Sequence, residues 1–137
     1  MKHKKIKISL LVLISFCVIF IVFTEINIAT YLKRYGYGTK ELPQATLVYF
    51  HLSEGFTVEN DGEYSVFIGS HSYIYDYVFG EKGYYEADRM GNAGFYSKKD
   101  EKKGNDDTFD FSIISTGDWC HWFRVYELSG GYKIEDF

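Results

Sequence analysis

Proline and cysteine are both scarce in this chain, and each scarcity excludes a class of protein. A single proline, Pro43, excludes collagen-like and proline-rich chains. Of the two cysteines, Cys17 lies in an apolar run near the N-terminus and Cys120 lies far beyond it, so we expect no internal disulfide. Cys120 is then either a small buried apolar residue or a thiol for a bridge to another chain. The part of the chain that follows the apolar run must be stabilised by its own hydrophobic core.

Basic residues are also few once the N-terminus is set aside. Lys2, Lys4, Lys5 and Lys7 account for four of the 15 lysines and arginines, and the remaining 11 face 19 acidic residues, a net charge of 11 − 19 = −8. This excess of acid argues against general nucleic-acid binding. Hydrophobic residues make up 46% of the chain and aromatic residues 20%, which is too much apolar material for a disordered protein. A length of 137 residues allows one domain.

The run from Ile8 to Phe23 carries no charged residue and directly follows the four lysines. A charged side chain at the centre of a bilayer is costly, so an uncharged run of this length indicates membrane insertion. It is longer than the hydrophobic part of a usual signal peptide, and no small-x-small cleavage site follows it. We therefore expect an uncleaved transmembrane helix over residues 8–24. The alternative is a cleaved signal peptide and a secreted or periplasmic product.

The lysines also predict the orientation and the division of the chain. By the positive-inside rule, residues 1–7 form a basic segment in the cytoplasm and the C-terminal part lies outside. Residues 25–44 are expected to extend the helix, which Gly36 and Gly38 then end, and to form a linker around Pro43. Residues 45–137 are expected to form an extracytoplasmic β domain.

From residue 45 onward, apolar and polar residues alternate with a period of two, which is typical of strands. Turn signals such as Asn60-Asp61-Gly62 and residues 129–131 separate the segments. The highly charged residues 98–107 are expected to form a solvated loop. The predicted strands comprise residues 46–52, 56–59, 63–68, 72–79, 84–87, 94–97, 108–115, 119–128 and 132–136.

Connections this short leave no room for crossover helices, so the sheet should be antiparallel. The sequence therefore predicts an all-β domain, a small antiparallel sandwich or barrel, preceded by one N-terminal transmembrane helix. The alternative is an α+β fold, in which a twisted antiparallel sheet carries a packed helix.

No motif in the chain indicates catalysis, a cofactor or a metal. His51, His71 and His121 lack the close spacing of metal ligands. Cys120 and His121 are neighbours in a predicted strand, so they point to opposite faces and cannot form a dyad. Four carboxylates lie near predicted strand ends, and no pair among them stands out as an acid–base pair; they are Glu63, Glu86, Asp88 and Asp118. We therefore expect a binding protein rather than an enzyme, with no catalytic residue, cofactor or metal.

The chain is rich in aromatic residues, with 13 tyrosines, 12 phenylalanines and two tryptophans. Tyrosine combines a large rigid ring with a polar end, which suits a wet contact surface. Tyr73, Tyr75 and Tyr77 share one face of a predicted strand, and Tyr84 and Tyr85 follow the next turn. These five tyrosines are the candidate binding face. The alternative is an ordinary sheet whose tyrosine hydroxyls lie in water.

These features favour a membrane-tethered interaction domain outside the cytoplasmic membrane of a bacterium. Its acidic charge favours a basic protein partner, since opposite charges speed the encounter. An inhibitor or immunity-type protein is one concrete form of this hypothesis. The alternatives are a cell-wall or glycan-binding module and a small hydrolase with an unrecognised site.

Overall fold

The computed structural model describes residues 2–98, 109–118 and 123–137, which divide into two compact units. The N-terminal unit comprises Met1–Leu42, and the second unit, here called the sheet domain, comprises Pro43–Phe137. Of the predicted loop at residues 98–107, Lys98 instead ends a strand, and the other residues lie outside the described ones, as do Cys120 and His121.

A single helix, α1 (Lys2–Arg34), carries the apolar run. The large apolar side chains from Ile8 to Phe23 are all at least half exposed. The stretch Ile8–Arg34 is long and apolar enough to cross a membrane, and such a helix fits a membrane anchor or a signal sequence. The helix continues beyond the apolar run, as predicted, and ends just before Gly36, whose φ of +85° suits a glycine at a helix C-terminus.

The prediction of a first strand at residues 46–52 is wrong. Most of this segment belongs to the helix α2 (Leu42–Tyr49), which follows a short 3-10 helix, η1 (Thr39–Glu41). Pro43 lies in the first turn of α2, where its missing N–H has no helical partner to lose. Ala45 and Val48, three residues apart, are both completely buried, which is the spacing of one helix face rather than of a strand.

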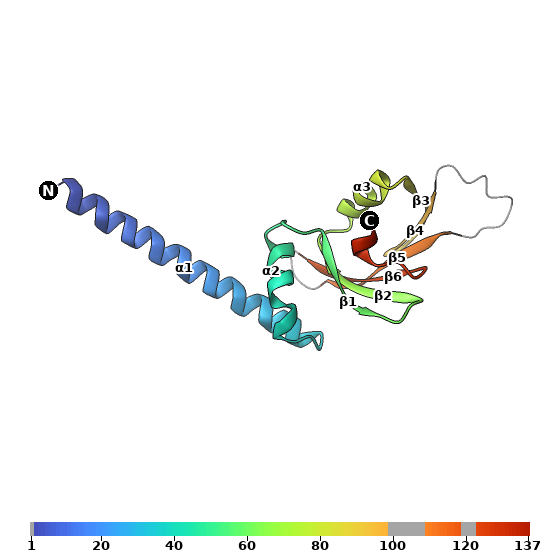
Figure 1. Ribbon diagram of the computed structural model, residues 1–137, viewed down its shortest axis with the longest axis horizontal. Coiled ribbons are helices and arrows are strands. Elements are labelled where there is room, and N and C mark those ends of the chain that lie inside the picture. Colours follow the sequence, from blue (N-terminus) through green and yellow to red (C-terminus); the bar gives the residue numbers. More distant parts are fainter. Residues whose placement is uncertain (1, 99–108, 119–122) are drawn as a thin grey trace. The chain divides into compact units, whose positions relative to one another are not determined.

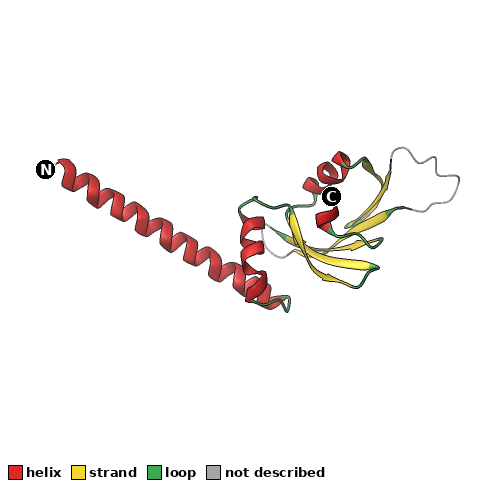
Figure 2. Ribbon diagram, in the orientation of Figure 1, coloured by secondary structure: helices red, strands yellow, loops and turns green. Residues whose placement is uncertain are grey.

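The sheet domain contains a six-stranded antiparallel sheet, shown in Figures 1 and 2. The predicted hairpin around Asn60-Asp61-Gly62 is confirmed, because the flanking strands pair across it and Gly62 has a φ of +92°. The last strand returns to pair with β2. In spatial order the strands are β1 (Gly55–Asn60), β2 (Tyr64–Gly69), β6 (Arg124–Ser129), β5 (Phe111–Asp118), β4 (Ala93–Lys98) and β3 (Tyr84–Met90).

Residues 72–79, predicted as a strand, instead form the helix α3 (Tyr73–Glu81). Its buried residues are Tyr75, Val78 and Phe79, whose spacing of three and four residues places them on one side of a helix. Tyrosine at every second position is also the pattern of a strand. A strand, however, would bury every second residue rather than residues three and four positions apart. The fold is therefore a mixture of helices and an antiparallel sheet, the α+β alternative, and not a purely all-β sandwich or barrel.

The predicted closing strand, residues 132–136, is also wrong, because this segment ends in a 3-10 helix, η2 (Ile134–Asp136). Glu135 lies beside the outer edge of β1. Its carboxylate accepts hydrogen bonds from the Thr57 N–H at 2.7 Å and from the Thr57 hydroxyl at 2.6 Å. The short helix thus occupies part of the exposed edge of the sheet.

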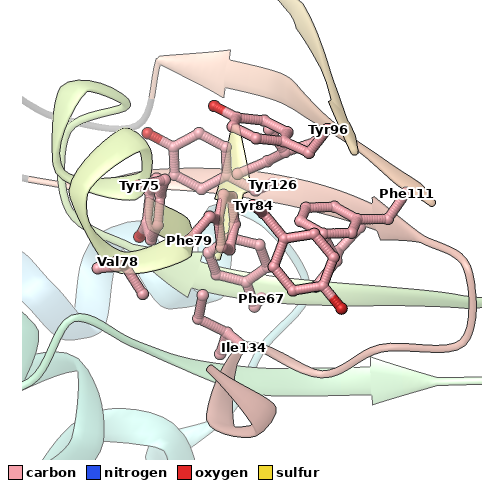
Figure 3. Packing of buried hydrophobic residues seen from close by; sticks show 11 residues of the cluster. Phe67, Tyr75, Val78, Phe79, Tyr84, Tyr96, Phe111, Tyr126 and Ile134 are labelled. Atoms are coloured by element: carbon pink, nitrogen blue, oxygen red, sulfur yellow. The ribbon is translucent and has the colours of Figure 1, made fainter. Parts of the chain in front are cut away.

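The core lies between α3 and one side of the sheet, here called the helix face (Figure 3). Phe79 of α3 makes edge contacts with Tyr96, Phe111 and Phe137, with ring centroids 4.6–4.9 Å apart. Such contacts add to the large apolar area that aromatic rings bury. Much of the aromatic content therefore forms the core. The sheet contributes Phe67, Tyr84, Tyr96, Phe111, Ile113, Tyr126 and Leu128.

Candidate functional site

The five predicted binding tyrosines do not share one surface. Tyr73 and Tyr77 lie one turn apart on α3 and are exposed, whereas Tyr75 between them is completely buried. Tyr84 belongs to the core, and Tyr85, the next residue of β3, is 44% exposed on the opposite side of the sheet. Because α3 is a helix, only alternate members of the predicted tyrosine row reach solvent. The remaining tyrosine surface is the Tyr73–Tyr77 pair, with Tyr85 apart from it.

The exposed pair on α3 is held by local contacts. The Tyr77 hydroxyl donates a hydrogen bond to the Glu81 carboxylate at 2.6 Å, and this bond raises the pKa of Tyr77. The ring of His71 stacks on Tyr73 with centroids 5.7 Å apart. Two aromatic rings are therefore presented side by side at the surface of α3.

The other residues considered for chemistry are scattered. Within residues 2–98, 109–118 and 123–137, no three histidines, cysteines or carboxylates lie close enough together to hold one metal ion. The Glu86 carboxylate forms an ion pair with Arg89, at 2.5 Å from its Nε, and this bond raises the pKa of Arg89. Asp88 occupies the opposite side of β3 from Glu86, since a bulge separates their register positions. Glu63 lies in the turn before β2.

On the side of the sheet that faces away from α3, Phe56, Ile68 and Val125 are buried at one end, and the rest forms a second surface, here called the open face. Strand residues alternate between the two sides, so the neighbours of the core residues point to the open face. One row crosses all six strands in register, because each residue in it is the Cα partner of the next. In spatial order this row is Glu59, Val66, Glu127, Ile114, Ala93 and Met90.

Aromatic rings lie along the open face beside this row. Tyr64 is 42% exposed, and Phe95, half-buried, contacts Phe109 with ring centroids 5.0 Å apart. Between them the hydroxyls of Ser112 and Ser129 are 3.0 Å apart. The open face is therefore a mixed surface of rings, short aliphatic side chains and hydroxyls.

The two sides of the sheet differ in charge, because basic strand residues accompany the acidic Glu86 on the helix face and none lies on the open face among the described residues. Among the described strand side chains, those on the open face that carry charge are Glu59, Asp88 and Glu127, and all three are acidic. Strand lysine and arginine residues lie on the helix face: Arg89, Lys98 and Arg124. The open face therefore presents negative charge together with apolar surface.

A hollow of about 380 Å³ at one end of the open face concentrates this charge. The Asp61 carboxylate at its rim accepts hydrogen bonds from the N–H groups of Tyr64 and Glu63, at 2.7 and 2.9 Å, and these bonds lower the pKa of Asp61. Asp61 therefore stays ionised at neutral pH. The hollow is lined by Glu59, Asn60, Asp61, Tyr64, Val66 and Glu127.

Comparisons with protein-family models, with curated proteins and with solved structures found no match to this chain. Its function is therefore argued from its own surfaces. Sequence reasoning missed the open face, although the alternation in residues 63–68 already predicted two distinct sides for that strand. The missing information was which side α3 covers.

Proposed function

We propose that this chain is a membrane-anchored binding protein. In this proposal α1 remains in the membrane as an uncleaved anchor, and the sheet domain binds a basic protein on the outer side through its open face. The observation that carries the proposal is the acidic charge of the open face, where Glu59, Asp88 and Glu127 accompany the exposed ring of Tyr64 and half-buried aliphatic side chains. An inhibitor or immunity-type role is the concrete form that we favour.

The chemistry of the open face suits a protein partner. Tyrosine, phenylalanine and methionine are enriched at protein interfaces, and the open face presents Tyr64, Phe95 and Met90. Carboxylates of one sign around such a patch speed the encounter with a basic surface and discriminate against acidic proteins. Lysine or arginine side chains of the partner would fit the hollow between Glu59 and Glu127.

Reversing the charge of Glu127 is expected to weaken partner binding by about tenfold or more, because a lysine there opposes a basic surface at the centre of the patch. The full chain in uncharged detergent micelles serves as bait for secreted proteins, and each recovered protein is then titrated against the wild-type chain and Glu127→Lys. Glu81→Lys is the matched control, since it makes the same charge change on α3. Binding of the wild-type chain should also weaken steeply from low to high salt.

Equal binding by Glu127→Lys and the wild-type chain would contradict the open face as the binding surface.

A glycan-binding role is the second candidate, and the exposed Tyr73–Tyr77 pair on α3 favours it. Retention on cell-wall polymer that resists salt and is lost in a Tyr73→Ala, Tyr77→Ala variant would support that role and overturn protein binding through the open face.

The proposed orientation predicts where a C-terminal reporter is active. A periplasmic-type phosphatase, which requires an oxidising compartment, is joined after Phe137 through a flexible linker. Its activity should be high, because the lysines before the apolar run retain the N-terminus in the cytoplasm. A cytoplasmic-type reporter at the same position is the control and should be inactive. The reverse pattern would refute the orientation and, with it, an extracytoplasmic partner.

A further inference from the structure

A pocket of about 490 Å³ opens on the helix face of the sheet domain, beside the residue that precedes α3. Its floor is formed by Tyr96, Ile113 and Tyr126 from three adjacent strands, and its wall includes Gly91 and Asn92 of the turn between β3 and β4. A volume of this size is within the range of small-ligand sites. The open face is on the other side of the sheet, so this pocket is a separate feature.

The charge of the pocket is opposite to that of the domain around it. The charged side chains among its described lining residues are Arg89 and Arg124, and no carboxylate lines it. The chain beyond its N-terminal lysines is strongly acidic. Two guanidinium groups from separate strands, β3 and β6, therefore meet at one pocket. Carboxylates stand behind both of them, since Arg89 pairs with Glu86 and Asp118 is the Cα partner of Arg124.

Arg89 is held in place by carboxylates that stand outside the pocket lining. Its Nε lies 2.5 Å from the Glu86 carboxylate, and its Nη2 lies 3.9 Å from Asp76. The same Asp76 oxygen accepts a hydrogen bond from the Tyr96 hydroxyl at 2.5 Å. These contacts orient the guanidinium and offset part of its charge, while 45% of the Arg89 side chain stays exposed. A guanidinium has five N–H donors, more than these two contacts engage.

Neutral polar groups complete the pocket. Ser72 lies at the N-terminus of α3, and its hydroxyl makes no capping bond to the helix. In the first turn of α3 the N–H groups of Ile74 and Tyr75 donate to the carbonyls of His71 and Ser72 at 3.1 Å, so this helix end contributes its dipole, which favours negative charge. The hydroxyl-bearing residues Ser115 and Thr116 also line the pocket, and Ser115 is hydrogen-bonded to Asn92 through its backbone. Arginine forks with neighbouring hydroxyls and amides are the groups that hold carboxylate and phosphate oxygens.

We infer that this pocket binds the oxyanion group of a small ligand, a phosphate or a carboxylate, between Arg89 and Arg124. The partial compensation of Arg89 by Glu86 and Asp76 leads us to expect millimolar affinity for a bare ion. The remainder of a natural ligand would occupy the rest of the pocket volume. Because this site and the open face use different residues, either one can fail while the other stands.

Nuclear magnetic resonance titration tests the inference on the full chain, labelled with ¹⁵N in uncharged maltoside micelles. Sodium phosphate and sodium acetate are titrated separately, with sodium chloride keeping the ionic strength constant. We expect saturable shifts of the backbone amides of Asn92, Gly94 and Ser115 with at least one of the two anions. The anion that saturates at the lower concentration identifies the ligand chemistry as phosphate or carboxylate.

Substitution assigns the shifts to the arginines. Arg89→Gln and Arg124→Gln should each weaken binding by about tenfold, since each removes a charge-assisted hydrogen-bond donor. Lys82→Gln is the matched control, because it removes the same charge at the end of α3, away from the pocket lining. If a glutamine variant fails to fold, Arg89→Lys or Arg124→Lys takes its place, and weaker binding is expected because lysine lacks the fork.

Shifts that grow linearly with both anions, or that vanish equally in Lys82→Gln, would overturn the inference. So would folded arginine variants that bind the anions as tightly as the wild-type chain.

Discussion

Replacing Gly69 with alanine is expected to destabilise the sheet domain by about 3 kcal/mol, at the upper end of the cost of overpacking a core. A Cβ atom at this position of β2 would lie 1.7 Å from the hydroxyl oxygen of Tyr75 and 2.9 Å from a ring carbon of Phe67. Tyr75 has no room to withdraw, because it is completely buried and its hydroxyl donates to the Glu54 carbonyl at 2.8 Å. Its ring also contacts Phe67 and Tyr126.

A second substitution makes this prediction specific. Tyr75→Phe alone should cost about 1 kcal/mol, because its hydrogen bond to the Glu54 carbonyl is lost while that carbonyl still accepts the Ser70 N–H at 3.2 Å. In the Gly69→Ala background the same change removes the atom that the new Cβ would strike, so the double variant should be more stable than Gly69→Ala alone. Urea unfolding of the full chain in micelles, followed by near-ultraviolet circular dichroism, measures both effects. Simple additivity of the two losses would contradict the proposed clash.

Replacing Phe79 with alanine is expected to cost about 4 kcal/mol, the range measured for truncating a buried phenylalanine. Phe79 is completely buried, with a relative exposure of 0%, and its ring lies in the aromatic core. The substitution removes edge contacts with Tyr96, Phe111 and Phe137 at once and leaves a cavity between α3 and the sheet. A domain of ordinary stability would lose a large part of its free energy of unfolding.

Two variants calibrate this result under the same urea titration. Phe79→Leu keeps most of the apolar volume and should lose about 1–1.5 kcal/mol. Tyr73→Ala lies on the same helix at an exposed position and should change stability by less than about 0.5 kcal/mol. A similar loss in Phe79→Ala and Tyr73→Ala would show that α3 is not packed on the sheet as described.

The sequence was most informative where structure is determined locally. The hairpin of β1 and β2 follows from Asn60-Asp61-Gly62, since glycine supplies the positive φ that the turn requires. The glycine at residue 36 likewise predicted the end of α1. In both places neighbouring residues alone decide the backbone conformation.

Sequence reasoning failed where tertiary packing decides between periods. Residues 73–79 contain apolar side chains at spacings that fit both a strand and a helix, and only the sheet available for packing selects the helix. The same ambiguity applies to α2, whose β-branched and aromatic residues favour a strand by propensity. The error at α3 changed the predicted fold class, because α3 covers the side of the sheet where a sandwich would have its second sheet.

The two candidate surfaces were beyond prediction for a related reason. Val66 and Glu127 are far apart in the sequence and become neighbours only because β6 returns to pair with β2. Arg89 and Arg124 reach one pocket through the same sheet order. The sequence predicted acidic charge and surface aromatics in general, while their grouping depends on long-range register.

The carboxylate of Glu135 has a consequence for the solubility of the protein. An edge strand is a template for a strand of another molecule, and a charge placed along it interrupts that template. Proteolytic loss of residues 134–137 would uncover the Thr57 N–H and remove Ile134 from the core in one cut. Molecules clipped in this way would be prone to polymerise through their exposed edges. The time for which the protein stays soluble would then depend on intact residues 134–137 as well as on the stability of the fold.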